Sequence, residues 1–184
     1  MSSIDEPTTK LGYKEYCLFP DNGYRHEIIN GRHFMNPAPS PDHQSVSKYL
    51  AHYLFSQIEL TLLGKVFYAP IDVQLGDYDI VQPDLVVILN DGAARITKVK
   101  IVGAPDLLIE ILSPSTRKND FTLKRQLYEQ AGVREYWIVD APKHEVTQLV
   151  LINGRYRKQL VDGDELVFNI LPAVKIPLPK IWNI

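Results

Sequence analysis

The sequence predicts a single mixed α/β domain in which buried strands alternate with helices and short strands end the chain. The first observation is a set of apolar runs at 85–89, 106–112 and 135–140, each with a length typical of strands buried on both faces. The second is a spacing of four between apolar residues in 43–63, which predicts a long amphipathic helix. The third is the alternation of β-compatible runs with Asn-Gly and Asp-Gly turns after residue 144, which predicts an antiparallel meander or hairpin.

Length and composition are those of an ordinary globular chain. At 184 residues, with 45% hydrophobic and 23% charged residues, the chain fits one domain with a substantial core. We expect a flexible N-terminal arm at 1–20 and a single domain at 21–184. The net charge of −2 argues against binding nucleic acid by bulk electrostatics, although a local basic patch stays open.

The cysteine content and the N-terminus predict a cytoplasmic protein. Cys17 is the single cysteine, so no intramolecular disulfide can form, which fits a reducing compartment. The first residues lack a charged region followed by an apolar run, as a signal peptide would have. No apolar stretch approaches the roughly 18 residues needed to cross a bilayer.

The first element after the arm is a predicted hairpin at 24–34. Asn30 and Gly31 both tolerate positive φ and lie between two β-compatible runs. Glu27 lies on the first strand of this hairpin. Two interpretations of Glu27 stay open: a solvated strand charge, or a further acid near a functional site.

The predicted helix at 43–63 has clear start and stop signals. Ser40 can cap it, with Pro41 at the first helical position, and Gly64 is expected to end it. His43 and Gln44 lie in its first turn. A lone histidine there is more often a surface or capping residue, so His43 matters only if this helix end faces the acids described below. The apolar stripe is Val46, Leu50, Leu54, Ile58 and Leu62.

The middle of the chain is predicted to contain further strands joined by turns. An extended strand is expected at 65–75, with Pro70 limiting its pairing, and a turn at 76–79 leads to the buried run at 85–89. The polar connection at 90–103 could include a short helix. Its basic residues could touch a phosphate backbone, but a solvated loop is the default interpretation.

A second helix is predicted between the last two buried runs. Asp120 can cap a helix that runs to about Ala131, and Gly132 stops it. Ser113 and Ser115 lie in the preceding turn, and no G-x-S-x-G context surrounds them, so a cap-and-turn role is favoured over a nucleophilic one. The chain also lacks a P-loop, a G-x-G-x-x-G and an H-E-x-x-H motif.

Two acids occur where apolar residues are expected. Asp84 opens one buried run and Glu110 lies inside the next. A buried carboxylate must be paired, protonated or bound to a cation, and two on neighbouring strands repel each other. Oxygen ligands without a Cys or His cluster favour Mg²⁺ or Mn²⁺, with the backbone carbonyl of Ile111 as a further ligand.

Asp120, Lys124 and Tyr128 follow at a spacing of four, so they share one helix face. If the helix packs across the strand ends, Lys124 can reach a metal-bound water and orient it or stabilise developing charge. Tyr128 could hydrogen-bond the lysine, a carboxylate or a phosphate. The competing interpretation is a surface Asp–Lys pair with a tyrosine lying beside it.

Five segments and the terminal strands together form a familiar pattern: HEIINGR, SPDHQ, VQPDLVVI, GAPDLLIEILSPSTRKND and LKRQLYEQAGVREYWIVD. With this pattern the chain resembles, over residues 12–182, the bacterial Uma family of restriction endonucleases in the PD-(D/E)xK nuclease superfamily. The stretch 105–140 is the most specific part. The resemblance implies a restriction-endonuclease-like core, a central mixed β-sheet flanked by helices, and Mg²⁺-dependent hydrolysis of a phosphodiester.

Site residues can be carried over by position. The resemblance makes Asp84 the motif aspartate and Glu110 the motif glutamate. The superfamily pattern places a lysine two residues after the glutamate, where this chain has Leu112. Families of this type can supply the lysine from the following helix, and Lys124 is then the candidate.

The resemblance also makes Glu27, together with His43 or Gln44, an addition to the site, and it implies a homodimer. Three functions remain open. The first is a Mg²⁺- or Mn²⁺-dependent DNA endonuclease that uses a metal-activated water. The second is a catalytically weak or inactive nucleic-acid-binding or regulatory protein with the same fold, which the missing adjacent lysine favours. The third is a structural homodimer.

Overall fold

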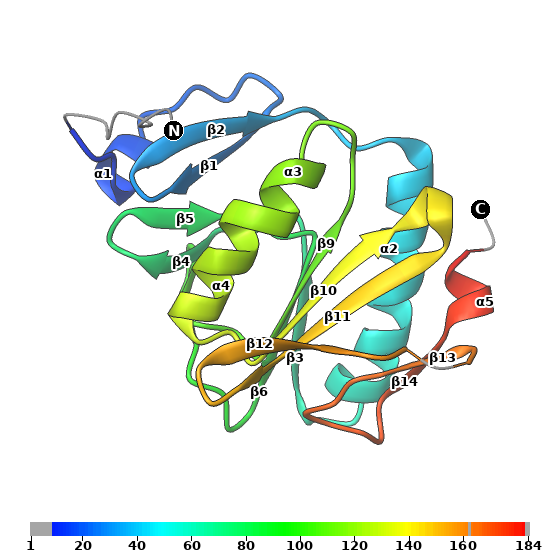
Figure 1. Cartoon of the computed structure of the whole chain (residues 1–184). Helices are drawn as coiled ribbons and strands as arrows, with labels where there is room; N and C mark the ends of the chain where they lie inside the picture. Colours follow the sequence, from blue (N-terminus) through cyan, green and yellow to red (C-terminus); the bar gives the residue numbers. More distant parts are fainter. Residues whose placement is uncertain (1–8, 162, 183–184) are drawn as a thin grey trace.

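A six-stranded mixed sheet forms the body of the computed structural model, which describes residues 9–161 and 163–182 (Figure 1). The strand order is β12-β11-β10-β9-β6-β3, and the central pair β9 and β10 is parallel while the other neighbours are antiparallel. This confirms the expected central mixed sheet. Its strands are β3 (Gly64–Tyr68), β6 (Leu85–Leu89), β9 (Leu107–Ile111), β10 (Glu135–Asp140), β11 (Glu145–Ile152) and β12 (Arg155–Gln159).

The two faces of this sheet bury two separate cores. Odd-numbered residues of β6, β9 and β10 pack on one face and even-numbered residues on the other, because side chains alternate along a strand. The helix α2 (Pro41–Leu54) covers the first face, and α4 (Arg125–Ala131) lies across the second (Figure 1). Glu110 is even-numbered, so it points toward α4.

A second six-stranded sheet, in the order β2-β1-β5-β4-β8-β7, packs beside α4 and adds Ile29, Val73, Val81 and Ile101 to the second core. The predicted hairpin is confirmed: Asn30 and Gly31 join β1 and β2 and both have positive φ. The strands are β1 (Arg25–Ile29), β2 (Arg32–Asn36), β4 (Val73–Gly76), β5 (Asp79–Val81), β7 (Arg95–Ile96) and β8 (Ile101–Val102).

The last strands differ from a continuous meander. After a 3-10 turn, η3 (Ala141–Lys143), β11 and β12 form the expected hairpin through Asn153 and Gly154. The next strand, β13 (Glu165–Val167), pairs with β14 (Lys175–Pro177) instead of β12. These strands and α5 (Leu178–Ile181) close the first core, because Phe168 and its apolar neighbours pack there.

The first long helix begins as predicted but ends earlier. Ser40 caps it, accepting a hydrogen bond from the His43 amide, and Pro41 is its first residue. The α-helix ends at Leu54 and continues as a π-helical turn, η1 (Phe55–Glu59). Gly64 was expected to end the helix, but it starts β3, where a Cβ atom would collide with the carbonyl oxygen of Ile88.

The single strand predicted at 65–75 is wrong. The chain leaves the main sheet after Tyr68 and enters the second sheet at Val73. Pro70 lies in the break, where its missing N–H removes a ladder donor. The connection at 90–103 contains the short strands β7 and β8 in place of the helix that was considered.

The second helical region starts three residues earlier than predicted. It consists of α3 (Arg117–Asn119), a π-helical turn η2 (Asp120–Lys124) and α4. Asp120 therefore lies inside the helical run and does not cap it. Gly132 ends the run with a φ of 87°, as predicted.

Part of the predicted arm packs on the domain. The short helix α1 (Tyr13–Tyr16) is held by a hydrogen bond of 2.6 Å from the Tyr16 hydroxyl to Asp72. Residues 1–8 lie outside the described residues, and the domain boundary at residue 20 stays a prediction. Among the described helices, none has the length and apolar character needed to span a membrane.

Candidate active site

Asp84 and Glu110 lie at the meeting point of β6 and β9. Asp84 directly precedes β6, whose first residue, Leu85, pairs with Ile109 of β9, the residue before Glu110. Both acids are buried, with 3% and 4% of their surface exposed. They line a cleft of about 320 Å³, the acid cleft, together with Lys124. The two acids singled out in the sequence therefore line one cleft, and their roles stay predictions.

Both oxygens of the Asp84 carboxylate have hydrogen-bond or ion-pair partners. Its Oδ1 accepts a 2.8 Å hydrogen bond from Arg25 Nη1, and its Oδ2 accepts one of 2.8 Å from the Ile111 amide. His43 Nε2 lies 3.1 Å from Oδ2. Burial by itself would raise the pKa of Asp84, but the bond to His43 and the charge of Arg25 hold that pKa at about 2. Asp84 is therefore ionised at neutral pH.

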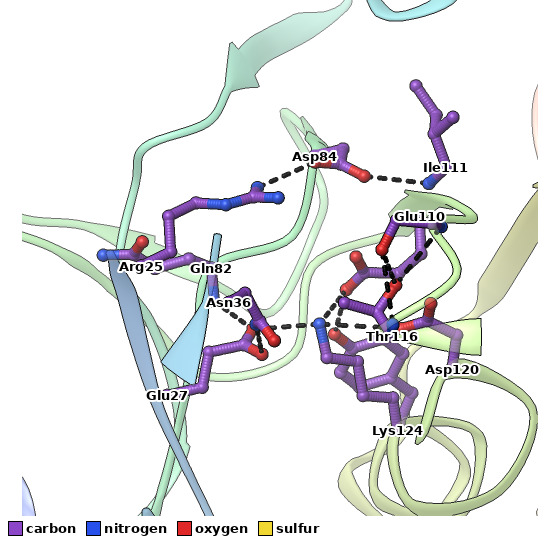
Figure 2. Close-up of polar contacts among 12 residues, drawn as sticks. Arg25, Glu27, Asn36, Gln82, Asp84, Glu110, Ile111, Thr116, Asp120 and Lys124 are labelled. Carbon is purple, nitrogen blue, oxygen red and sulfur yellow. Dashed lines mark hydrogen bonds and ion pairs between the residues drawn. The ribbon is translucent and has the colours of Figure 1, made fainter. Parts of the chain in front are cut away.

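Glu110 is bonded from the neighbouring helix. Its Oε1 accepts hydrogen bonds from Lys124 Nζ at 2.9 Å and from the Tyr128 hydroxyl at 2.7 Å. Lys124 Nζ also lies 2.9 Å from Glu27 Oε1 and 3.8 Å from Asp120 Oδ1. Figure 2 shows the lysine pointing between Glu27 and Glu110, so one ammonium group is shared among three carboxylates.

Glu27 belongs to this cluster and is not a solvated strand charge. Only 1% of its surface is exposed. Besides Lys124, its carboxylate accepts hydrogen bonds of 2.7 Å from Asn36 Nδ2 and 2.8 Å from the Gln82 amide (Figure 2). The first hairpin therefore places Glu27 within the site.

The cluster contains more negative than positive charge. Glu27, Glu110 and Asp120 surround the single charge of Lys124, and Arg25 offsets only Asp84. Burial, reinforced by the neighbouring acids, raises the pKa of Glu110 to about 8 and that of Asp120 to about 6. Burial would lower the pKa of Lys124, but the carboxylates outweigh it and raise that pKa. All three shifts favour uptake of a proton or another cation.

The donor chemistry fits a hard divalent cation. Asp120 is 1% exposed, and neither of its carboxylate oxygens has a hydrogen-bond partner among the described residues. Carboxylate oxygens are the ligands that Mg²⁺ and Mn²⁺ prefer. Within 9–161 and 163–182, no three His, Cys, Asp or Glu side chains converge closely enough to hold an ion, and Asp84 and Glu110 as metal ligands stay a prediction. The carbonyl of Ile111 as a ligand stays a prediction.

The structure shows where Leu112 and Lys124 lie relative to Glu110. Leu112, at the position where the superfamily pattern has lysine, is buried in the second core with only 7% of its surface exposed. Lys124 reaches Glu110 from the helical run instead. The geometry thus brings together all six side chains proposed as catalytic from the sequence, whose roles stay predictions: Asp84, Glu110, Lys124, Glu27, His43 and Tyr128. Gln44 is exposed and lines a neighbouring cleft.

Sequence reasoning missed three contributors. Arg25 binds Asp84, Asn36 binds Glu27, and the Gln82 amide binds Glu27. The sequence could have predicted that Arg25 lies near the site. Side chains alternate along a strand, so Arg25, two residues before Glu27, lies on the same face as Glu27. Asn36, at the end of β2, had no comparable signal.

Comparisons with known proteins identify the family of the chain and a solved structure with a similar fold. The family model Uma2, described as "Putative restriction endonuclease", matches residues 13–179. A solved structure described as "a putative nuclease belonging to DUF820" from Anabaena variabilis has a TM-score of 0.76 at 18% sequence identity, covering 94% of this chain and 97% of that chain. At this identity the likeness shows the fold. Among curated proteins, none matches the chain.

Proposed function

The chain belongs to the Uma2 family, described as "Putative restriction endonuclease", and on this premise we propose that it is a metal-dependent DNA endonuclease. Its metal ion would be Mg²⁺ or Mn²⁺, and its reaction the hydrolysis of a phosphodiester bond. The observation that carries the proposal is the convergence of Asp84 and Glu110 on adjacent strands, with Lys124 Nζ 2.9 Å from Glu110.

Asp84 and Glu110 would hold the cation, with the backbone at Ile111 beside them. A bound divalent cation supplies Lewis-acid polarisation of the phosphoryl group and offsets the charge that develops there. Lys124 and Tyr128 orient the Glu110 carboxylate, because both donate to its Oε1. Lys124 stays protonated among its carboxylates and can stabilise negative charge or orient an attacking water.

Arg25 and His43 define the other side of the site. Arg25 binds Asp84, yet 21% of its side chain is exposed at the cleft, so its guanidinium can also meet a substrate phosphate. His43 lies at the first turn of α2 and keeps Asp84 Oδ2 in place from the opposite direction. These contacts position the motif aspartate before any substrate arrives.

A second candidate is a nucleic-acid-binding protein of the same fold that does not cleave. The observation that favours it is the full engagement of Asp84, whose two oxygens already accept from Arg25 and Ile111 and contact His43. In that case Arg25 would take the place of the cation. As the resemblance implies, we also propose a homodimer, which sedimentation of the purified chain would test.

A plasmid-nicking assay with Mg²⁺ or Mn²⁺ separates the two candidates. We expect nicking by the wild type, and its loss in Asp84→Ala and Glu110→Ala purified in the same way. Glu165→Gln is the matched control, since this acid is 56% exposed and its ion pair joins β13 and β14. Metal-independent DNA binding without cleavage, unchanged in the two alanine variants, would favour the second candidate.

A further inference from the structure

A second cleft opens beside the acid cleft. It has a volume of about 430 Å³ and shares five lining residues with its neighbour: Arg25, Ala38, Pro39, His43 and Asp84. We call it the side cleft and define its own walls by Ser47, Lys48 and Ala51 on α2, by Tyr68 at the end of β3 and by Pro70 after this strand. Because these shared residues form a common wall, whatever occupies the side cleft lies next to the group held at Asp84.

The walls of the side cleft are mostly apolar. Ala51 lies on one side and Pro70 on the other, and the Tyr68 side chain at the edge is highly exposed, at 69%. The polar side chains of the lining come from α2 and from the boundary with the acid cleft: Arg25, His43, Gln44, Ser47, Lys48 and Asp84. A volume in the range of about 300 to 1,000 Å³ with apolar walls and few polar groups is typical of a small-molecule site. A flat heteroaromatic ring matches this chemistry, and the tyrosine offers it a stacking partner.

Positive charge flanks the side cleft. Arg25 lies at the boundary with the acid cleft, and Lys48 lies one turn further along α2 than Gln44. The only acid in the lining is Asp84, which Arg25 already pairs. A ring that bears phosphate on both sides, as a nucleotide in a chain does, suits an apolar slot between two cations.

The base that enters such a slot must leave its stack. In a paired duplex the faces of the bases are covered by their neighbours, so only base edges and the backbone can contact a protein. Apolar contact with a base face requires a single-stranded, mismatched or extruded nucleotide. The side cleft therefore favours substrates that contain an unpaired position.

We propose that the side cleft binds one unpaired nucleobase of the DNA, adjacent to the phosphate presented to Asp84 and Glu110. This inference rests on the proposed function, because it places the base within the substrate of the same site. It narrows the substrate to DNA with a single-stranded, bulged or frayed nucleotide at the point of cleavage.

The test measures DNA affinity separately from cleavage. Three labelled duplexes are compared by fluorescence anisotropy with Ca²⁺ as the divalent cation, and intact DNA is verified on a gel afterwards. One duplex is fully paired, one has a single extra adenosine, and one has an abasic residue at that place. We expect the extra adenosine to bind about tenfold more tightly than either comparison, the size typical of one stacked base.

Two variants locate that preference in the side cleft. Tyr68→Ala removes the exposed ring, and Ala51→Trp fills the slot from α2. Both are expected to reduce the preference to less than threefold. Tyr78→Ala is the matched control, because Tyr78 is also exposed, at 45%, but lies outside both clefts in the turn between β4 and β5. Circular dichroism checks the fold of each variant.

The outcomes separate this inference from the proposed function. Equal affinity for the adenosine and abasic duplexes would overturn the side-cleft proposal, as would a preference that survives folded Tyr68→Ala. Loss of the preference in both variants with wild-type behaviour in Tyr78→Ala supports it. If the preference is present while no DNA is nicked with Mg²⁺ or Mn²⁺, the nuclease function fails and the base site stands.

Discussion

Lys124 is the residue on which the charge balance of the site depends. Its ammonium group lies 2.9 Å from both Glu27 and Glu110 and is only 3% exposed. Without it, three buried carboxylates would face each other. Removing one partner of a buried ion pair leaves uncompensated charge, which is far more costly than losing a surface pair.

Lys124→Ala is therefore expected to lower the free energy of unfolding by roughly 3–5 kcal/mol, measured by urea denaturation. Lys118→Ala, six residues earlier and exposed on the same helical run, is expected to change it by less than about 0.5 kcal/mol. Added Mn²⁺ should restore part of the lost stability in Lys124→Ala. Equal stability of the two variants would contradict the shared-ammonium arrangement.

Glu135 is a buried acid that lies away from the site. It is fully buried in β10 and accepts hydrogen bonds from Trp137 Nε1 at 2.6 Å and from the Gln148 amide. Burial raises the pKa of Glu135 from its ordinary value of 4.5, although these donors act in the opposite direction. The folded chain thus retains this proton at a higher pH than the unfolded chain does.

Through Glu135, a rise in pH destabilises the folded chain. Below pH 4.5 the acid is protonated in both states, and above it the unfolded chain releases the proton first, so stability is lost as pH rises toward the raised pKa. Glu135→Gln removes this loss. We expect the melting temperature of the variant relative to wild type to increase as the pH rises through the interval above 4.5. A constant difference across that interval would contradict a raised pKa.

At the scale of elements, the junction between η1 and β3 is set by a close backbone approach. Gly64 pairs with Leu89, and a Cβ at this glycine would meet the Ile88 carbonyl and the Leu89 Cα. The end of β3 leads directly to Tyr68, a wall of the side cleft. Packing at Gly64 therefore positions part of the proposed substrate site.

Gly64→Ala is expected to destabilise the chain by roughly 1–3 kcal/mol, because the neighbouring backbone must shift to admit a methyl group. Thermal unfolding with a calorimeter measures the change. Lys65→Ala, at the next and exposed position, is the control and is expected to have little effect. Similar losses in both variants would show that the close approach does not limit this junction.

At the scale of the whole molecule, the site joins parts of the chain that fold onto opposite faces of one sheet. Arg25 comes from the first hairpin, Asp84 and Glu110 from the main sheet, His43 from α2 and Lys124 from the helical run on the other face. A cation bound by Asp84 and Glu110 would link β6 to β9, two strands of the main sheet. Ligand binding to the folded state alone raises its stability.

Mg²⁺ or Mn²⁺ is therefore expected to raise the melting temperature of the wild type, by an amount corresponding to about 2.7 kcal/mol at a hundredfold excess over the dissociation constant. EDTA should reverse the shift and abolish nicking. Glu110→Gln keeps the shape of the side chain but is expected to lose the shift. An equal shift in wild type and Glu110→Gln would place any bound metal elsewhere.

Interactions between residues that are close in the sequence determined most of the helices, strands and turns. Asn30–Gly31 supplies the positive φ that a two-residue hairpin needs, Ser40 and Pro41 start α2, and five successive apolar residues form β6. Asp84 and Glu110 could be recognised as candidate site residues because a buried carboxylate needs a cation or hydrogen-bond donors to offset its charge. These signals act over a few neighbouring residues, so they can be recognised without a fold.

Only the tertiary structure decided which distant residues meet. Arg25 and Asp84 are 59 residues apart in sequence, and their pairing depends on how the two sheets pack. The break of the expected 65–75 strand, the pairing of β13 with β14 and the contact of Lys124 with Glu110 likewise depend on register and packing. Spacing along the chain places Asp120, Lys124 and Tyr128 on one face, but the helix can turn that face to solvent or to the acids. The burial of Leu112 and the pull of three carboxylates on one ammonium group select the second orientation.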